Sequence, residues 1–547
     1  MHSLQKSGLL VSIQDNVLVS VGLLDCFLGE VILVYTEGTE CTGLVLDLEL
    51  EAARLVLIKG TQRSIKKNFT LHRTFTGVKT TAGFGVLGLT INPLGIILND
   101  LYSMEDSSFL SELLFIEIWN NSPGIIDRKQ ITFPVLTGIA AIDCFIPIGC
   151  GQRELIIGDN NTGKTSLAIT MVISQKHVIN AADYVWRAFE SVAFHTTRLQ
   201  RIVPCIYVFI GKRRSELVRI QNVLATKGAL HYTCLLFSGS DELASLQYLA
   251  AYAGCAIGEW FRDYGYHPIV IYDDLSEHAV AYRQIALLLR RPPGREAYPG
   301  DVFFVHSKLL ERSAQLSKQC GGGSLTSFPI IETKGGDISS YIPTNVISIT
   351  DGQIFLSKSM VNKGLRPAVD LGLSVSRVGS KAQLKCVKYV TKKIKRDYAL
   401  YKAYEGLSKV SSDLDVTLAG YVKRGTAIIA FLKQSLYSTY NLYQMVIGFF
   451  LLSEGFLDNI ILNNIVLYLE LFFNGTFVAM YLESNMELVF FASTELIVSY
   501  DSLFKVFKMN TFFKQLQLLG SLYESFYLQT IEPLIKNALY GTAINTI

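Results

Sequence analysis

The spacing of hydrophobic and polar residues changes twice along the 547 residues of the chain. In residues 9–89, short runs rich in β-branched residues alternate with turn-forming residues, as in residues 31–35, 43–46 and 55–58. Strands that follow one another at this spacing predict a small β-barrel. In residues 92–383, strand-like runs alternate with helical patterns and glycine-rich turns, which predicts a parallel α/β sheet.

The strand pattern fades after Leu384, and apolar residues then recur at helical spacing, as at Val387, Val390 and Ile394. This periodicity predicts a bundle of helices. A chain of this length is too long for one hydrophobic core. We therefore expect a multidomain chain with a β-barrel in residues 1–91, an α/β domain in residues 92–383, and an α-helical domain in residues 384–547 that ends in an extended, aromatic-rich tail.

Two segments need a separate interpretation. Residues 434–453 carry no charge, but only residues 445–452 are continuously apolar, whereas a helix needs about 20 apolar residues to cross a bilayer. We therefore expect a buried helix there rather than a membrane span. Residues 178–201 lie between two predicted sheet elements and are expected to form a helical insertion.

The composition argues against several classes of protein. The formal net charge is only +3, so no electrostatic pattern favours a nucleic acid as the partner. The nine cysteines include no Cys-x-x-Cys pair, which favours reduced thiols over a zinc site or a disulfide framework. The first residues resemble neither a secretory signal nor an Arg-rich transit peptide. Either a leader has been removed or the chain is made where it works, and the 50% of hydrophobic residues favours the second.

A phosphate-binding loop is the clearest chemical motif. Residues 158–165 match the pattern Gly-x-x-x-x-Gly-Lys-[Ser/Thr] and stand between a strand-like run and a helical one. In this arrangement, backbone N–H groups and the helix N-terminus face the phosphates of a nucleotide. Lys164 neutralises the outer phosphates, and the hydroxyl of Thr165 binds Mg²⁺. The alternative, a glycine-rich turn that merely precedes a helix, is disfavoured because the strand and the helix both stand where the motif needs them.

An acidic pair, Asp273 and Asp274, follows the apolar run of residues 269–272. A carboxylate at the end of a buried strand beside a phosphate loop can hold the water shell of Mg²⁺. An aspartate pair after a strand is by itself more often a turn. With the phosphate loop present, we favour Asp273 as the Mg²⁺-side residue and Asp274 as a structural one, and we expect the chain to bind a Mg-nucleotide.

Several longer segments around these motifs resemble the alpha subunits of F-type ATP synthases, in a divergent form of the mitochondrial type. The segments are residues 147–149, 151–158, 272–284, 287–301, 342–355 and 373–379. The likeness is dense in residues 134–383, fainter before them and weak after Ser438. The run Arg-Pro-Pro-Gly-Arg-Glu-Ala at residues 291–297 is typical of alpha rather than beta subunits.

This resemblance implies a RecA-like fold for the central domain and a site for ATP or ADP with Mg²⁺. The residues that it assigns to the nucleotide are Gly158, Asn161, Gly163, Lys164, Thr165, Ser166, Asp273, Arg366, Pro367 and Gln434. Arg366 and Pro367 would flank the base, and Gln434 would reach it from the helical domain. Thr165 would bind Mg²⁺ directly and Asp273 through water.

The resemblance also implies the partners. The chain would alternate with beta subunits in an alpha3-beta3 ring, around a central rotor shaft and beside a peripheral stalk, with no nucleic acid. It would meet a membrane only through the rest of the complex. A mitochondrial form would serve proton-driven ATP synthesis on the matrix side of the inner membrane, and the composition suits a chain encoded in the organelle.

The chain departs from the family pattern at two places near the nucleotide. Family members commonly have Arg-Gln where Asn160 and Asn161 stand here, and a second Gln where Leu436 stands. Both changes remove long polar side chains from the site. We therefore expect weaker nucleotide binding than the phosphate loop alone suggests.

Hydrolysis of ATP needs a carboxylate that orients and polarises the attacking water. In the beta subunits of this family it is a Glu that follows a Gly at the end of a strand. In the matching turn here Lys212 follows Gly211, and an ammonium group cannot act as a general base at neutral pH. Alpha subunits usually have Gln there, so the chain departs from both patterns. Glu216 is expected in the following helix rather than at the strand end, so we predict a non-catalytic site.

By resemblance, Arg377 is an arginine finger that reaches the nucleotide of the adjacent beta subunit. A guanidinium in that place stabilises the charge that develops on the transferring phosphoryl group. Ser374 would help to shape the same interface between subunits. The alternative for an arginine of this kind is an ordinary surface salt bridge.

Three other functions compete with this interpretation. A catalytic, beta-type subunit is disfavoured by Lys212 and by the run at residues 291–297. An RNA-translocating hexameric ATPase would need an aromatic or basic nucleic-acid site in the barrel, and residues 1–90 show neither pattern. A structural relative that has lost its nucleotide is disfavoured by Lys164 and Asp273.

Overall fold

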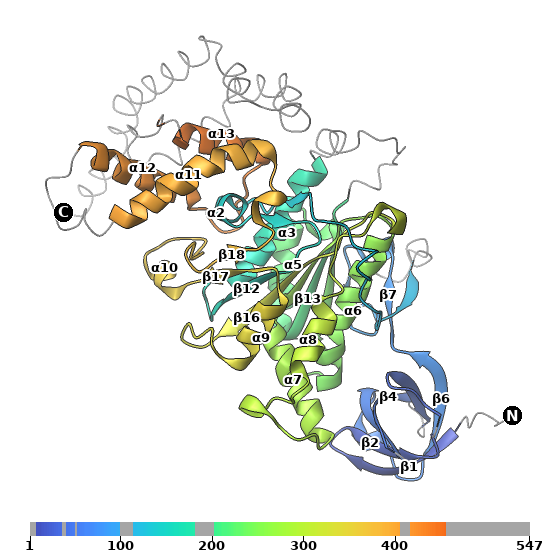
Figure 1. Ribbon diagram of the computed structural model, residues 1–547. Coiled ribbons are helices and arrows are strands. Elements are labelled where there is room, and N and C mark those ends of the chain that lie inside the picture. Colours follow the sequence, from blue (N-terminus) through green and yellow to red (C-terminus); the bar gives the residue numbers. More distant parts are fainter. Residues whose placement is uncertain are drawn as a thin grey trace, which may run out of the picture. The chain divides into compact units, whose positions relative to one another are not determined.

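The computed structural model describes residues 7–23, 25–35, 40–49, 52–98, 113–180, 202–404, 416–453 and 455. The predicted insertion beyond residue 180 and the predicted aromatic-rich tail lie outside the described residues. Within them, a β-barrel, a parallel α/β sheet and a helical region follow one another along the chain (Figure 1), so the predicted fold class is confirmed.

Six antiparallel strands close into the N-terminal barrel in the order β1-β2-β5-β4-β3-β6. These strands are β1 (Ser7–Gln14), β2 (Val17–Val21), β3 (Glu30–Tyr35), β4 (Glu40–Leu48), β5 (Ala52–Lys59) and β6 (Thr70–Gly77). Side chains alternate between the two faces of each strand, so that Leu18, Ile32 and Leu55 are buried in one cluster inside the barrel. Closure of the sheet leaves no free strand edge.

The central domain contains an eight-stranded sheet in the order β18-β17-β12-β16-β15-β13-β14-β8. Its strands are β8 (Thr90–Ile91), β12 (Glu154–Asp159), β13 (Cys205–Lys212), β14 (Thr233–Gly239), β15 (Ile269–Asp273), β16 (Thr326–Thr333), β17 (Gly352–Leu356) and β18 (Val375–Ser376). Neighbouring strands run parallel except for β17 and β18.

The end of the barrel differs from the sequence-based boundary at residue 91. The last barrel strand ends at Gly77, and Thr90–Ile91 pairs with β14 of the central sheet. Between them, β7 (Lys79–Ala82) pairs with β9 (Leu114–Glu117), and β10 (Pro134–Val135) later pairs with β11 (Ile148–Gly149). A two-residue strand carries no pattern of its own, so the sequence does not reveal which sheet it joins.

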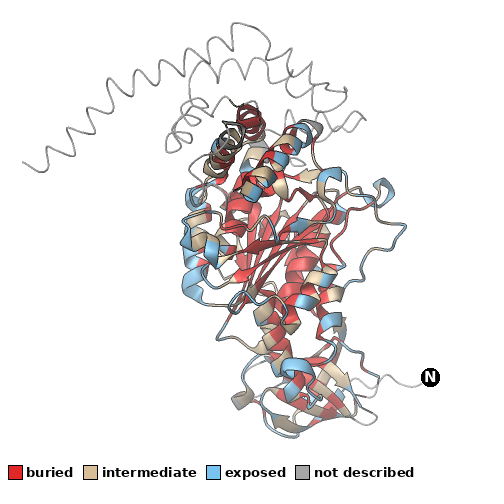
Figure 2. Ribbon diagram, turned by 60° about the vertical axis from the view of Figure 1, so that its left-hand side comes forward, coloured by how far each residue is buried: buried red, intermediate tan, exposed pale blue. Residues whose placement is uncertain are grey.

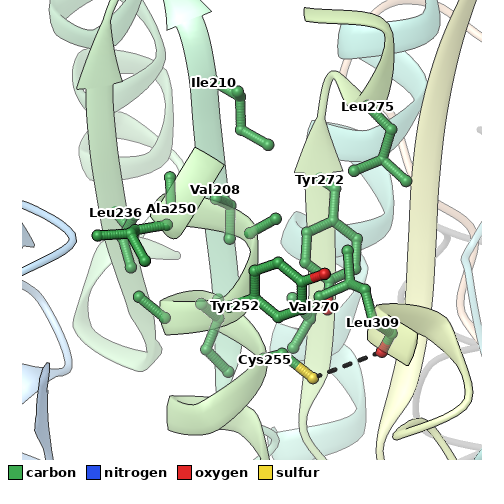
Figure 3. Close-up of a cluster of buried hydrophobic side chains, with 14 of the residues drawn as sticks. Val208, Ile210, Leu236, Ala250, Tyr252, Cys255, Val270, Tyr272, Leu275 and Leu309 are labelled. Atoms are coloured by element: carbon green, nitrogen blue, oxygen red, sulfur yellow. Dashed lines mark hydrogen bonds between the residues drawn. The ribbon is translucent and has the colours of Figure 1, made fainter. Parts of the chain in front are cut away.

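Helices cover the central sheet on both faces (Figure 1). α3 (Lys164–Asn180) packs beside α5 (Arg214–Thr226), and α6 (Ala244–Asp263), α7 (Leu275–Leu288) and α9 (Tyr341–Ile349) also pack on the sheet. α8 (Val302–Leu310) packs against α6 and α9. Buried residues therefore concentrate along the strands (Figure 2). Figure 3 shows side chains of β13, β15, α6 and α8 meeting in this core, among them Val208, Tyr272 and Cys255. Continuous burial explains why these strands have nearly uninterrupted apolar sequences.

The helical region contains α11 (Lys385–Tyr404), α12 (Val416–Leu432) and α13 (Leu442–Ser453), which contact one another. Val390 and Ile394 of α11 are buried, as their spacing predicts. Met445, Phe449 and Leu452 are buried in α13, which confirms the predicted buried helix. In the described parts of the chain, no helix has both the length and the apolar character that a bilayer span requires. Two shorter helices, α2 (Ala140–Phe145) and α10 (Lys358–Asn362), precede this region.

Candidate functional site

A cavity of about 430 Å³ opens where strands β12, β13, β15 and β16 end. Ligand sites of parallel α/β sheets lie at these carboxyl ends. The predicted nucleotide residues that line the cavity are Asn161, Gly163, Lys164, Thr165, Ser166, Asp273, Arg366, Pro367 and Gln434. Gly158 does not line it and lies at the base of the phosphate loop. The structure therefore brings the phosphate loop together with residues that lie more than a hundred positions further along the chain.

The phosphate loop owes its shape to its glycines. Gly163 has φ +97°, a left-handed conformation that a residue with a Cβ rarely adopts. A Cβ on Gly158 would come within 2.6 Å of the carbonyl oxygen of Leu356, so only glycine allows β17 to lie this close. The ammonium of Lys164 donates to the carbonyl oxygens of Gly158 at 2.9 Å and Asp159 at 2.7 Å. Burial lowers the pKa of Lys164, and this buried cation stands beside the place of the phosphates.

Asp273, at the end of β15, faces Thr165 at the start of α3. The hydroxyl of Thr165 donates to Asp273 Oδ2 over 2.9 Å, and the phenol of Tyr207 donates to the same oxygen over 2.8 Å. Burial and the nearby carboxylate raise the pKa of Tyr207 well above its ordinary value, so the phenol remains a donor. Asp274 Oδ1 accepts a hydrogen bond from the N–H of Glu277 and caps α7, as its predicted structural role requires.

Lys212 reaches both aspartates from the end of β13. Its ammonium lies 3.1 Å from Asp273 Oδ1 and 3.0 Å from Asp274 Oδ2. Burial alone would lower the pKa of Lys212, but the two carboxylates outweigh burial and raise the pKa well above its ordinary value. The residue that the resemblance puts at the general-base position is thus a cation paired with two carboxylates. The sequence predicted the cation, but the pattern of residues did not reveal its partners.

The cavity lining also includes the residues that were predicted to meet the base. Arg366 is exposed and Pro367 is partly buried, and both line the cavity. Gln434 is buried, but its amide is bound to the backbone: Oε1 accepts from the N–H of Ala140 at 2.9 Å, and Nε2 donates to the carbonyl of Gly138 at 3.0 Å. The side chain lines the cavity, and its amide is bound to the backbone of the central domain.

Two charged lining residues were missed in the sequence. Glu332 lies near the end of β16, in register with Gly158 of the neighbouring strand β12. Arg219 lies on α5 and lines the same cavity. The sequence does show that Glu332 is a carboxylate near the end of an apolar strand. Its place in the cavity cannot be inferred from that pattern without knowledge of the strand order. Glu216 lies in the first turn of α5, as predicted, and also lines the cavity.

Arg377 and Ser374 do not line the cavity. Arg377 follows β18 and is exposed, and its guanidinium has no ion-pair partner in the part of the chain that the structure describes. Ser374 is buried, and its hydroxyl accepts from the N–H of Phe355 at 2.9 Å and donates to the carbonyl of Asp370 at 2.6 Å. Ser374 therefore fixes the backbone next to β18, and the exposed Arg377 directly follows this strand.

The donor groups of the site suit a nucleotide with a hard cation. Thr165 and Asp273 offer a hydroxyl and a carboxylate, which are oxygen ligands of the kind that Mg²⁺ prefers. Among the described residues, no group of three or more His, Cys, Asp or Glu side chains could hold a metal alone. Mg²⁺ would therefore have to share its ligands with phosphates. One feature fits less well, because Lys212 already contacts the other oxygen of Asp273.

Comparisons with known proteins agree with these features. A family model described as "ATP synthase alpha/beta family, nucleotide-binding domain" matches residues 138–376. A second model, described as "ATP synthase alpha/beta chain, C terminal domain", matches residues 383–477. The ATP synthase subunit alpha of Ehrlichia ruminantium (strain Gardel) is 46% identical over 459 residues, which cover 84% of this chain and 85% of the relative. The subunit of the same name in Neorickettsia sennetsu is 44% identical over 457 residues, with 83% and 85% covered. That of Sulfurovum sp. is 44% identical over 453 residues, with 83% of each covered.

Proposed function

The chain belongs to the ATP synthase alpha/beta family as an F-type alpha subunit, and from this premise we propose that it binds a nucleotide without hydrolysing it and completes the catalytic site of an adjacent beta subunit. Its complex makes or hydrolyses ATP. The observation that carries the proposal is Lys212, which occupies the end of β13 and is paired with Asp273 and Asp274.

The cavity supports binding of ATP or ADP. N–H groups of the phosphate loop and the N-terminus of α3 would meet the phosphates, and Lys164 would turn from its two carbonyl partners to the outer phosphate. Arg366 and Pro367 would flank the base, and Gln434 would hold the backbone beside it. With Asn160, Asn161 and Leu436 in place of longer polar residues, the affinity should be modest.

A Mg²⁺ ion, when bound with the nucleotide, would neutralise phosphate charge. Thr165 would ligate it, and Asp273 would hold its water shell. The hydroxyl and the carboxylate already face one another at 2.9 Å, which supports this assignment.

Absence of hydrolysis follows from the same end of the cavity. No carboxylate stands at the end of β13, and the ammonium of Lys212 cannot accept a proton from water at neutral pH. Glu216, the carboxylate on the neighbouring helix, lines the cavity and is an alternative base. Its place in the first turn of α5, beyond the strand end, disfavours that role.

Arg377 supports the second half of the proposal. An exposed guanidinium without an ion-pair partner among the described residues can meet phosphate on another chain. As an arginine finger, it would stabilise charge on the transferring phosphoryl group in the beta subunit. Ser374 would position the backbone that carries Arg377, because its hydroxyl forms hydrogen bonds with the backbone of Phe355 and Asp370.

The assembly proposed for the chain is the alternating ring with beta subunits around a rotor shaft, held by a peripheral stalk. We propose the matrix side of the mitochondrial inner membrane as its place of action, in proton-driven ATP synthesis. The named relatives come from bacteria, so the support for an organelle is the hydrophobic composition, which suits synthesis inside it. Fractionation of the source cells with an antibody against the chain tests the location, and recovery with a bacterial plasma membrane would contradict it.

The purified full-length chain provides the test of the nucleotide site. Equilibrium dialysis with ATP measures binding, and phosphate release over many turnovers measures hydrolysis on the same sample. We expect binding without release of phosphate. Multiple-turnover hydrolysis that Glu216→Gln abolishes would make Glu216 a base and the site catalytic, and failure to bind ATP under any condition would remove the nucleotide from the proposal.

A further inference from the structure

The ammonium of Lys212 stands where the charge of a divalent cation would otherwise be needed. Asp273 and Asp274 are adjacent buried carboxylates whose side chains are each 3% exposed. Lys212 Nζ lies within 3.1 Å of an oxygen from each of them. The remaining oxygen of Asp273 accepts hydrogen bonds from Thr165 and Tyr207, so both of its oxygens have partners within the chain.

This arrangement changes what a metal ion would find. Two adjacent carboxylates in a poorly solvated place repel one another and require a cation nearby. Lys212 supplies one that is covalently attached to the protein. A Mg²⁺ ion that approached Asp273 would meet a positive charge already bonded to the same carboxylate, and it would have to displace that charge or lie further away.

A purely structural tie between β13 and β15 is the simpler explanation of this ion pair. The position of Lys212 argues for more than that. Its side chain is 20% exposed and lines the cavity together with Lys164 and Thr165, the residues of the phosphate loop, so Lys212 borders the space in which phosphates are proposed to bind. The cavity lining also holds the exposed cations Arg219 and Arg366 and the carboxylates Glu216 and Glu332, so Lys212 is one of several charges that a bare polyphosphate would meet.

We infer that Lys212 takes over much of the charge of Mg²⁺, so that this site binds a nucleoside di- or triphosphate with little dependence on a divalent cation. The inference rests on the proposed nucleotide binding at the phosphate loop. Metal-free ATP or ADP is the ligand class, and Lys164 and Lys212, which both line the cavity, would meet its phosphates. The site then differs from a catalytic site in two respects, because Lys212 both replaces the general base and supplies positive charge that Mg²⁺ would otherwise provide.

The experiment compares ATP binding by the full-length chain in excess Mg²⁺ and in excess EDTA, by isothermal titration calorimetry. For the wild-type chain we expect the two dissociation constants to agree within about tenfold, because the fixed ammonium makes charge-assisted contacts in both conditions. For Lys212→Gln we expect the constant in EDTA to rise by roughly tenfold or more relative to that in Mg²⁺, since the freed carboxylates then need the metal. The matched control is Arg219→Gln, which removes a cation from the same cavity without touching the aspartates, and it should weaken binding equally in both conditions.

Bound metal gives a second readout that does not depend on the variant folding. With Mn²⁺ in place of Mg²⁺, electron paramagnetic resonance counts bound metal per bound ATP, and we expect substoichiometric Mn²⁺ on the wild-type chain. One tightly held Mn²⁺ per ATP, or a wild-type preference for Mg²⁺ of about a hundredfold or more, overturns the inference. An equal Mg²⁺ dependence in Lys212→Gln and wild type does the same. Absence of ATP binding in both conditions would instead refute the proposed function on which the inference rests.

Discussion

At the nucleotide cavity, two lysine side chains have partners within the chain. Lys212 pairs with Asp273 and Asp274, and Lys164 donates to two carbonyl groups of its own loop. At the edge next to β18, the arrangement is the reverse. Arg377 is exposed and has no ion-pair partner within the described ranges, although the backbone around it is braced by Ser374.

This difference separates two uses of positive charge. In the cavity, the ammonium of Lys212 and the carboxylates of Asp273 and Asp274 compensate one another before any ligand arrives. At the edge, the exposed guanidinium of Arg377 stays hydrated, and under the proposed function it meets charge on a second chain. The proposed function predicts that the two regions respond oppositely to mutation.

Loss of Arg377 should have the largest effect on turnover. Arg377→Ala is expected to lower multisite ATP hydrolysis by the assembled complex roughly 10³-fold or more, because a finger of this kind stabilises the transition state directly. Binding of ATP by the chain itself should hardly change, since Arg377 does not line the cavity. Steady-state hydrolysis by the reconstituted complex and calorimetry on the isolated chain measure the two quantities.

The conservative variant sharpens this prediction. Arg377→Lys keeps the charge but replaces the planar fork by a single ammonium, so it should restore little of the lost turnover. An alanine variant that assembles normally and hydrolyses ATP at nearly the wild-type rate would make Arg377 an ordinary surface residue. The comparison between cavity and edge would then lose its functional meaning.

Loss of Lys164 should act on the opposite region. Lys164→Ala is expected to weaken ATP binding by the chain roughly tenfold to hundredfold, because a charge-assisted contact to the outer phosphates disappears. Turnover of the complex should fall less than it does when the corresponding lysine of the beta subunit is replaced. Equal losses of turnover from the two replacements would contradict a non-catalytic site.

The features that the sequence predicts well are local. Alternation within a strand indicates the barrel, the spacing of Val390 and Ile394 indicates α11, and the phosphate loop is a contiguous motif whose shape depends on Gly163. Each depends on residues that are close in sequence, so a single chain is enough to recognise it.

Features that depend on the order of strands in the sheet could not be predicted from the sequence. Glu332 joins the cavity only because β16 lies beside β12, and Thr90–Ile91 belongs to the central sheet only because β8 pairs with β14. Lys212 was predicted to be unable to act as a base, but its pairing with both aspartates follows from β13 lying beside β15, where Phe209 is in register with Asp273.

Gln434 provides the smallest and most selective test of the cavity. By resemblance it reaches the base, whereas in the structure its amide is bonded to the backbone of Gly138 and Ala140. Gln434→Leu keeps the volume but leaves the buried N–H of Ala140 without its acceptor, so we expect the free energy of unfolding to fall by about 1–3 kcal/mol. Thermal and denaturant unfolding of the full-length chain measure this loss.

The nucleotide distinguishes the two roles of Gln434. If the side chain holds the backbone, Gln434→Leu should weaken binding of ATP and of inorganic triphosphate by the same small factor, because the whole cavity wall relaxes. If it contacts the base, ATP binding should fall while triphosphate binding and unfolding stay as in the wild type. Leu436→Gln is the matched comparison, since Leu436 is 54% exposed, lines the same cavity and forms no part of this hydrogen-bonded tie. Adding an amide there should favour ATP over triphosphate without a change in unfolding, so a base contact and a structural tie give opposite patterns at two positions only two residues apart.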